Sequence, residues 1–246
     1  MPDSLSKISD DIARCTLCPR LREYCLRVAS QKRRMFRDDD YWGLPVAGFG
    51  DAGARLLVLG LAPAAHGGNR TGRVFTGDRS GDWLYAALHK YGFANQPVSM
   101  RRDDGLRLTG AYVTAAARCA PPKNKPTPGE FGNCRKYLIR ELGALLEVRV
   151  VLCLGRLALD NYMAARSELN LALPRPRLLF GHGAEWRSPE GIAVCCSYHP
   201  SQQNTQTGRL TQPMFHALFS RVRDLAAAPP RQEGRDSLGG GEQGFA

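Results

Sequence analysis

Short apolar runs alternate along the chain with segments whose apolar residues recur at helical spacing. The runs fall at residues 55–60, 111–117, 150–155 and 192–198 and are rich in valine, leucine, alanine and cysteine. Continuous apolar runs of this length are typical of strands that are buried on both faces of a sheet. Strands that alternate with helices therefore predict an α/β fold with a mostly parallel sheet covered on both sides.

The intervening segments carry helix signals at their ends as well as in their periodicity. Ser80 is the expected N-cap of the helix that follows residue 79. Thr127 and Glu130 form a capping box around Pro128, which is suited to the first helical position. The predicted helices span residues 4–14, 21–35 and 80–91, a segment that begins after Thr127, and a last segment that begins near Pro213.

A chain of 246 residues is long enough for one full core. We expect a single domain over residues 1–226. Residues 227–246 are rich in proline, glycine and glutamine, with little to bury, and we expect a disordered tail there. No apolar run is long enough to span a bilayer and the first residues lack a signal-peptide pattern, so we expect a cytoplasmic protein with no membrane partner.

The chain is strongly basic, with a formal net charge of +11 and only six lysines among its 34 basic residues. Arginine binds phosphates with two parallel hydrogen bonds and stacks on bases, so this balance favours a nucleic-acid partner. A GC-rich genome, which encodes arginine in preference to lysine, is the alternative explanation of the bias.

A glycine-rich loop follows the first apolar run and leads into the helix at residues 80–91. It contains five glycines and three arginines around one aromatic residue, Phe75, and one carboxylate, Asp78. Ligands bind at the carboxyl ends of strands in open α/β sheets, and this composition suits a nucleobase that is still attached to its phosphate backbone. The alternatives are that Asp78 caps the following helix and that Phe75 belongs to the core. A nucleotide-binding phosphate loop is disfavoured because the Gly-Lys-Ser/Thr signature is missing.

Two other polar loops follow predicted strands and should face the same edge of the sheet. Asn124 lies in the Pro-Pro-Lys-Asn segment, and His199 begins the His-Pro-Ser segment after the last strand. His199 is either a packing residue or part of the site. The loop from Gln202 to Thr211, with Leu210, is the expected element that wedges into a duplex.

Eight cysteines in a cytoplasmic protein should not form disulfides. Four of them have a spacing that suits metal ligation, by zinc or by an iron–sulfur cluster, with plain thiols as the third possibility. They are Cys15, Cys18, Cys119 and Cys134. Cys153, Cys195 and Cys196 are interpreted as core residues, and Cys25 as a core residue that could also join the metal site.

Three motifs of this chain resemble those of the family 5 (type B) uracil-DNA glycosylases. They are Gly60-Leu-Ala-Pro-Ala-Ala-His with Phe75-Thr-Gly-Asp78, Cys119-x-Pro-Pro-x-Asn124, and His199-Pro-Ser201. The resemblance runs from about Ile12 to Leu225. It implies a three-layer α/β/α sandwich around a four-stranded, mostly parallel sheet. It also implies a structural [4Fe–4S] cluster on the four cysteines named above.

The resemblance assigns roles to individual residues. Phe75 would stack on a flipped base, and His199 would hydrogen-bond that base as it departs. Asp78 would stabilise the sugar cation and orient the attacking water, and Asn124 would position the water or the base. The other expected base-binding residues are Leu61, Ala62, Ala115 and Ser201.

The expected activity is that of a monofunctional DNA glycosylase in base excision repair. Its substrate would be uracil in double-stranded DNA, with single-stranded DNA left open, and its oligomeric state a monomer. Related iron–sulfur uracil glycosylases of a neighbouring family carry an asparagine that recognises the edge of uracil, on the strand before the Pro-Pro loop. In this chain the matching position is Ala115. We therefore expect broadened specificity that includes hypoxanthine and ethenocytosine. The alternative function is a non-catalytic iron–sulfur module that binds nucleic acid.

Overall fold

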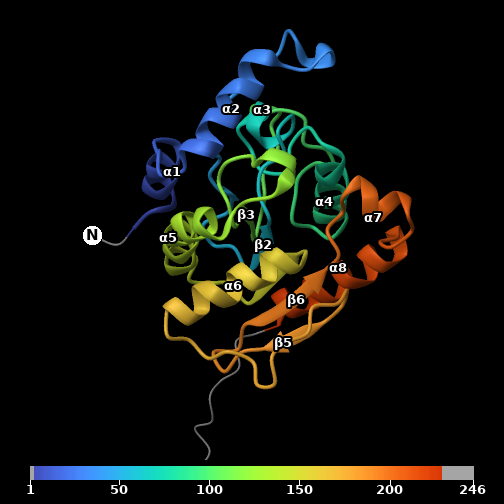
Figure 1. Ribbon diagram of the computed structural model, residues 1–246. Coiled ribbons are helices and arrows are strands. Elements are labelled where there is room, and N and C mark those ends of the chain that lie inside the picture. Colours follow the sequence, from blue (N-terminus) through green and yellow to red (C-terminus); the bar gives the residue numbers. More distant parts are fainter. Residues whose placement is uncertain (1–2, 229–246) are drawn as a thin grey trace, which may run out of the picture.

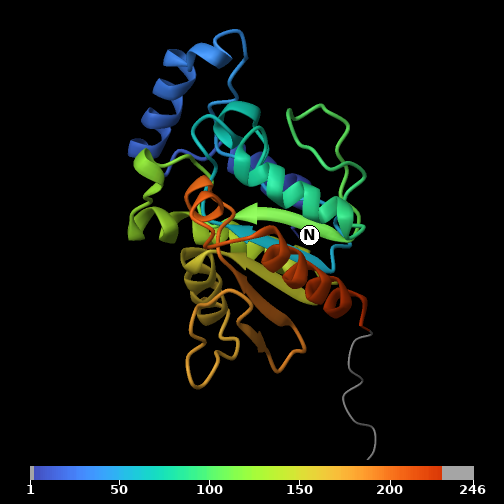
Figure 2. The same ribbon diagram turned by 90° about the vertical axis from the view of Figure 1, so that its right-hand side faces the viewer.

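The computed structural model describes residues 3–228, in which a mixed sheet of six strands lies between two layers of helices (Figures 1 and 2). The strand order is β1-β3-β2-β4-β6-β5, and the four central strands are mutually parallel. The strands are β1 (Phe49–Gly50), β2 (Leu56–Gly60), β3 (Ala111–Ala115), β4 (Val150–Leu154), β5 (Glu185–Arg187) and β6 (Ala193–Ser197).

The predicted four-stranded sheet is correct for the parallel centre but incomplete at both edges. β1 pairs with β3 and β5 pairs with β6, each in the antiparallel sense. These edge strands are only two and three residues long and are half exposed or exposed, so they lack the apolar run that marked the four central strands. All five residues of each central strand are buried, as expected for strands covered on both faces.

Eight α-helices occur among residues 3–228, with short 3₁₀ turns at Arg34–Phe36 and Pro122–Asn124. The helices are α1 (Leu5–Ala13), α2 (Pro19–Gln31), α3 (Gly68–Thr71), α4 (Arg79–Lys90), α5 (Pro128–Ala144), α6 (Arg156–Glu168), α7 (Gln202–Gln206) and α8 (Gln212–Ala227). None of them is long and apolar enough to cross a membrane. The predicted helix at residues 21–35 ends earlier, at Gln31, because Lys32 has a left-handed φ of 43°.

Two hydrophobic clusters fill the space on either side of the sheet. One cluster joins α4 and α8 to the side chains on one face of the central strands, and the other joins α5 and α6 to the opposite face. Cys195 and Cys196 lie in different clusters, which confirms that they point to opposite faces. Cys153 is fully buried, as expected.

The helix ends that face the site are capped by side chains. Thr127 and Glu130 make the predicted capping box at the start of α5. The predicted Ser80 cap of α4 is wrong, because the helix begins at Arg79 and the Asp78 side chain is its N-cap. The tail predicted from residue 227 onward lies outside the described residues, apart from the end of α8 and Ala228.

Candidate active site

The loop between β2 and α4 brings Phe75 to the carboxyl edge of the sheet. Phe75 has a left-handed φ of 52°, and its backbone packs so closely on Gly81 that a β-carbon there would overlap the Phe75 carbonyl. Its ring edge rests on Gly60, where a β-carbon would come within 2.6 Å of Phe75 Cζ. Gly60 and Gly81 are therefore required by close approach to this residue. Phe75 is 9% exposed and part of the core cluster on this face, so its ring is packed before any ligand arrives.

Asp78 lies three residues further along the same loop, with its carboxylate held by backbone. Oδ1 accepts the Gly81 N–H at 2.9 Å, and Oδ2 faces Gly67, where a β-carbon would overlap it. Burial raises the pKa of the Asp78 carboxyl above its ordinary value, while the N–H groups of Gly81 and Ser80 act in the opposite direction. The structure therefore confirms the alternative prediction that Asp78 caps α4. The cap hydrogen bond from the Gly81 N–H goes to Oδ1 and not to Oδ2.

His199 follows β6 and lies against the same aromatic residue. The rings of Phe75 and His199 are stacked with their centroids 5.8 Å apart and an interplanar angle of 28°. Asn204 donates from Nδ2 to the His199 carbonyl at 2.8 Å, and Gly155, after β4, packs on the His199 β-carbon. Burial lowers the pKa of His199 to about 4, so its imidazole is neutral at physiological pH. Asn204 was not assigned a role from the sequence, although it lies five residues after His199.

The depressed pKa of His199 predicts a specific dependence of stability on pH. In the unfolded chain the imidazole takes up a proton near pH 6.5, whereas in the folded protein it does so only near pH 4. The unfolded state binds more protons between these values, so the free energy of unfolding is undiminished above pH 6.5 and falls as pH is lowered towards 4, by at most about 1.4 kcal/mol per pH unit. Calorimetric melting of the native protein and of His199→Asn between pH 4.5 and 7.5 should show a shallower acid decline in the variant. Equal slopes would contradict the burial of a neutral ring.

The other predicted base-binding residues differ in their burial and in the elements that they contact. Ala115 is buried, is paired in register with Gly60, and belongs to the same core cluster as Phe75. Leu61 and Ala62 are half-buried and pack beneath the loop after β3. Ser201 caps α7, with its hydroxyl accepting the Asn204 N–H at 3.3 Å.

Asn124 is the predicted residue that the structure does not bring into contact with the others. It is exposed on the 3₁₀ turn after β3, with a left-handed φ of 55°. None of the hydrogen bonds found among residues 3–228 joins its side chain to Asp78 or His199. The prediction that Leu210 wedges into a duplex does not fit the structure either, because its side chain is fully buried in the core cluster that contains α8.

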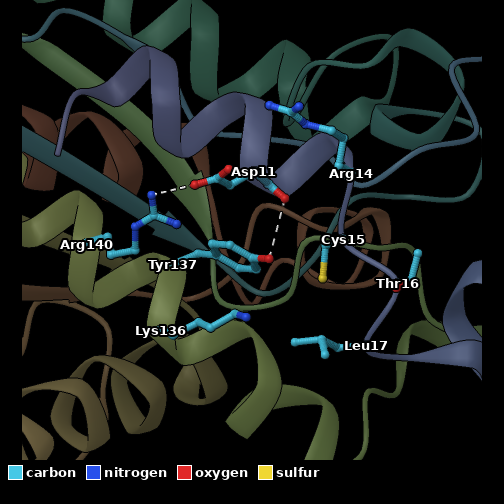
Figure 3. Close-up of a pocket in the computed structure, with 8 residues that line it drawn as sticks. All are labelled: Asp11, Arg14, Cys15, Thr16, Leu17, Lys136, Tyr137 and Arg140. Carbon is cyan, nitrogen blue, oxygen red and sulfur yellow. Dashed lines mark hydrogen bonds and ion pairs between the residues drawn. The ribbon is translucent and has the colours of Figure 1, made fainter.

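The four predicted cysteine ligands lie around the start of α5. Cys18 and Cys119 share one small apolar cluster, Cys134 lies in the next cluster, and Cys15 packs beside Tyr137. Cys15 is half-buried in a pocket between α1 and α5, where it faces the Tyr137 side chain (Figure 3). Within residues 3–228, no group of three or more cysteine, histidine or acidic side chains converges closely enough to hold a single metal ion.

The polar groups around these cysteines fit a sulfur-ligated cluster. Asn133 Nδ2 lies 3.4 Å from Cys18 Sγ. Burial raises the pKa of Cys134 to about 11, whereas the backbone N–H and the guanidinium of Arg118 favour its thiolate. Arg118 Nε is buried and has no hydrogen-bond partner. Donors directed at cysteine sulfur, and one left without an acceptor, are what an iron–sulfur cluster requires of its surroundings.

A fifth cysteine, Cys25, lies next to the predicted ligands Cys18 and Cys119. Cys25 is fully buried, contacts Cys119, and its thiol donates to the Ala120 carbonyl at 3.6 Å. From the sequence, Cys25 was interpreted as a core residue that could also join the metal site. In the structure it contacts Cys119, which is one of the four predicted ligands.

Comparisons with known proteins agree with this geometry. The family model described as the uracil DNA glycosylase superfamily matches residues 47–223. A type-5 uracil-DNA glycosylase of Thermus thermophilus is 51% identical over 212 residues, which cover 86% of this chain and 94% of that protein. A second one, from Mycobacterium bovis, is 47% identical over 91% of this chain and 82% of its own length. A third, from Pyrobaculum aerophilum, is 46% identical over 86% and 88%. The chain therefore belongs to the uracil DNA glycosylase superfamily and, within it, to the type-5 enzymes.

Proposed function

We propose that this protein is a monofunctional DNA glycosylase that hydrolyses the N-glycosidic bond of deoxyuridine in double-stranded DNA during base excision repair. The observation that carries the proposal is the close packing of one loop and one histidine at the carboxyl edge of the sheet. Phe75 and Asp78 lie three residues apart on that loop, and His199 stacks on Phe75. The names of the type-5 relatives support uracil as the base.

Each of these three side chains suits one part of the reaction. The Phe75 ring offers a flat surface for a base that has left the stack. Asp78, with Oδ1 held by the Gly81 N–H, places negative charge where the sugar becomes cationic and orients the attacking water. His199 is neutral, so it donates a hydrogen bond to the uracil anion as it leaves and does not transfer a proton.

The remaining predicted site residues would act on the bound DNA. Because Asn124 is exposed on its turn, we assign it to positioning the water or the base after the DNA has docked. The backbone at Leu61 and Ala62 would line the base site, and Ser201 would hold the start of α7 beside it.

The lysines near the site support hydrolysis by water over attack by an amine. Lys123 and Lys125 both lie on the exposed turn that carries Asn124, and neither is in the desolvated pocket that an amine nucleophile requires. An abasic site should therefore be the product. We also propose that the enzyme is a cytoplasmic monomer that associates with the nucleoid when it acts on DNA.

A duplex oligonucleotide with one uracil tests the function directly. The native protein should release free uracil and leave an alkali-labile abasic site, and a single-stranded substrate shows whether a duplex is required. Borohydride should trap no covalent adduct. Binding of the duplex without release of uracil would instead establish a non-catalytic nucleic-acid module.

We also propose that Cys15, Cys18, Cys119 and Cys134 hold a [4Fe–4S] cluster with a structural role. When bound, the cluster would tie the N-terminal helices to the loop after β3 and to α5, and it would take no part in glycosidic bond cleavage.

Protein purified from iron-replete cells should be brown and should contain acid-labile sulfide. Cys18→Ala should lose the colour, because it removes a ligand, whereas Cys153→Ala in the core of the sheet should keep it. Cys25→Ala should also keep the colour, since Cys25 is outside the predicted ligand set. Stoichiometric zinc without sulfide would contradict the cluster.

Ala115 predicts the breadth of base specificity. A site that hydrogen-bonds one base edge rejects other bases because its own polar group is left unpaired, and alanine has no such group. The native protein should therefore release hypoxanthine and ethenocytosine as well as uracil. Ala115→Asn should shift the preference towards uracil by about tenfold, as measured by single-turnover rates on matched duplexes. An unchanged ratio in the variant would exclude this role for Ala115.

A further inference from the structure

The loop at residues 97–104 is fixed to the segment that carries Phe75 and Asp78, although it enters and leaves from the opposite end of α4. The Gly77 N–H donates to the Ser99 carbonyl at 2.9 Å, and Gly77 directly precedes Asp78. Ser99 Oγ also lies 2.7 Å from Thr76 Oγ1. The loop is therefore hydrogen-bonded directly to Gly77, the residue next to the proposed catalytic carboxylate of Asp78.

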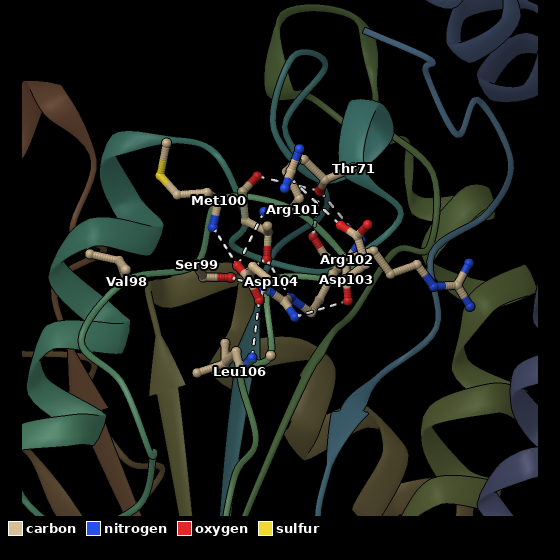
Figure 4. Close-up of polar contacts among 12 residues, drawn as sticks. Thr71, Val98, Ser99, Met100, Arg101, Arg102, Asp103, Asp104 and Leu106 are labelled. Carbon is tan, nitrogen blue, oxygen red and sulfur yellow. Dashed lines mark hydrogen bonds and ion pairs between the residues drawn. The ribbon is translucent and has the colours of Figure 1, made fainter.

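A buried ion pair holds the loop in this place. Arg73 is 3% exposed, and its Nη2 donates to both carboxylate oxygens of Asp104, at 2.8 and 2.7 Å. The same carboxylate accepts the N–H groups of Met100, Arg101 and Leu106, which closes the loop into a turn (Figure 4). A buried pair with this many hydrogen bonds gives the turn a fixed shape before DNA arrives.

The tip of the turn exposes apolar side chains next to cationic ones. Val98 is 49% exposed and Met100 is 56% exposed, and both point away from the Asp104 contacts (Figure 4). Arg101 and Arg102 are exposed beside them, and Asp103 is the acidic neighbour, 3.7 Å from Arg101. Proteins that unstack a duplex use this combination, in which an apolar residue enters between bases and arginines contact the phosphates.

The turn also continues towards the glycine-rich loop on its other side. The Arg102 guanidinium lies over the Trp42 ring, 4.5 Å from its centroid, and Trp42 packs against Gly72. The turn is therefore joined to the glycine-rich loop through Trp42 as well as through the Gly77–Ser99 hydrogen bond. Leu210, the residue predicted to wedge into the duplex, is fully buried and cannot fill that role in this conformation.

We propose that the turn at residues 97–104 is the element that contacts the duplex next to the flipped nucleotide, with Met100 supported by Val98 inserted against the neighbouring bases and Arg101 and Arg102 on the flanking phosphates. This inference rests on the proposed function, because it assigns the duplex-opening step of that same site. The occupant of the surface is double-stranded DNA.

The test compares substrates that differ only in how much duplex must be opened. Uracil paired with adenine requires the most opening, a G·U mispair less, and single-stranded DNA none. Met100→Ala should slow single-turnover excision from the A·U duplex about tenfold, the G·U duplex less, and single-stranded DNA less than twofold. Met100→Leu should retain the native rates because it keeps a large apolar side chain.

A binding measurement reports the same step without cleavage. A duplex with 2′-fluorodeoxyuridine next to 2-aminopurine should brighten on binding native protein, and that increase should be at least halved for Met100→Ala. Arg101→Gln/Arg102→Gln should weaken binding and flatten its salt dependence, whereas Arg223→Gln on α8 should not.

Leu146→Ala is the matched control, because Leu146 is 84% exposed but lies between α5 and β4 at the far edge of the sheet. If the native protein excises uracil and Met100→Ala behaves as Leu146→Ala does on all three substrates, the inference is wrong while the proposed function stands. Met35, on the 3₁₀ turn after α2, is 73% exposed and is the rival apolar residue. If Met35→Ala instead produces the duplex-specific loss, the wedge belongs to that turn and the inference is equally overturned. A native protein that releases no uracil would refute the proposed function itself.

Discussion

Asp78→Asn should lower the rate of uracil excision about a thousandfold while leaving the fold and the affinity for DNA intact. Asparagine keeps a side-chain oxygen that can accept the Gly81 N–H, and it is as good an N-cap as aspartate. The substitution therefore removes the negative charge and little else. Loss of charge stabilisation that acts in the transition state costs several kcal/mol of barrier, and each 1.36 kcal/mol is about a tenfold change in rate.

The two roles of Asp78 can be separated by a second substitution. Asp78→Ala removes the cap as well as the charge, so it should lose activity to the same extent and also about 1 kcal/mol of stability. Thr211→Ala is the control for the cap, since Thr211 accepts the Met214 N–H at the start of α8, away from the loop of Asp78. Thr211→Ala should lose a similar amount of stability to Asp78→Ala while leaving the rate of uracil excision unchanged. Single-turnover excision and thermal melting measure both effects, and a native rate in Asp78→Asn would remove Asp78 from the mechanism.

The sequence predicted the parts of this fold that are specified locally. Apolar runs marked the four central strands, and the capping box at Thr127 marked the start of α5 correctly. The edge strands β1 and β5 could not be predicted, because they are too short for a periodic pattern and depend on pairing with β3 and β6. Pairing between distant segments leaves no local signal in so few residues.

The candidate site was predicted unevenly for the same reason. The loop with Phe75 and Asp78 is continuous in sequence, so its composition was informative. Burial of Leu210 depends on packing against α8, and a single leucine in a polar segment does not reveal it. The Arg73–Asp104 pair joins residues 31 positions apart and has no motif. Only the folded chain shows that it fixes a second loop beside the site.

Arg118 and Glu141 form a pair buried between the site and the cysteines, and breaking it should cause the largest loss of stability. Their side chains are 1% and 0% exposed, and they are joined by two hydrogen bonds of 2.7 and 3.0 Å. Thr114, which precedes Ala115 on β3, also donates to Glu141, at 2.9 Å. Arg118 in turn directly precedes Cys119. The pair therefore links the strand of the base site to the cysteine loop.

Arg118→Met would leave the Glu141 carboxylate buried without its cation, which costs about 3–5 kcal/mol and should lower the melting temperature of the intact protein by about 10 °C. Adding Glu141→Gln removes the uncompensated charge and keeps an acceptor for Thr114, so the double variant should recover more than half of that loss. Arg221→Met breaks an exposed pair with Glu185 and should change the melting temperature little, because surface ion pairs contribute at most about 1 kcal/mol. A double variant no more stable than Arg118→Met would show that lost packing, and not the isolated charge, destabilises the protein. Because Glu141 lies on α5 and Thr114 on β3, recovery in the double variant would establish that the unpaired Glu141 charge, and not the loss of the ion pair itself, accounts for most of the destabilisation between these two elements.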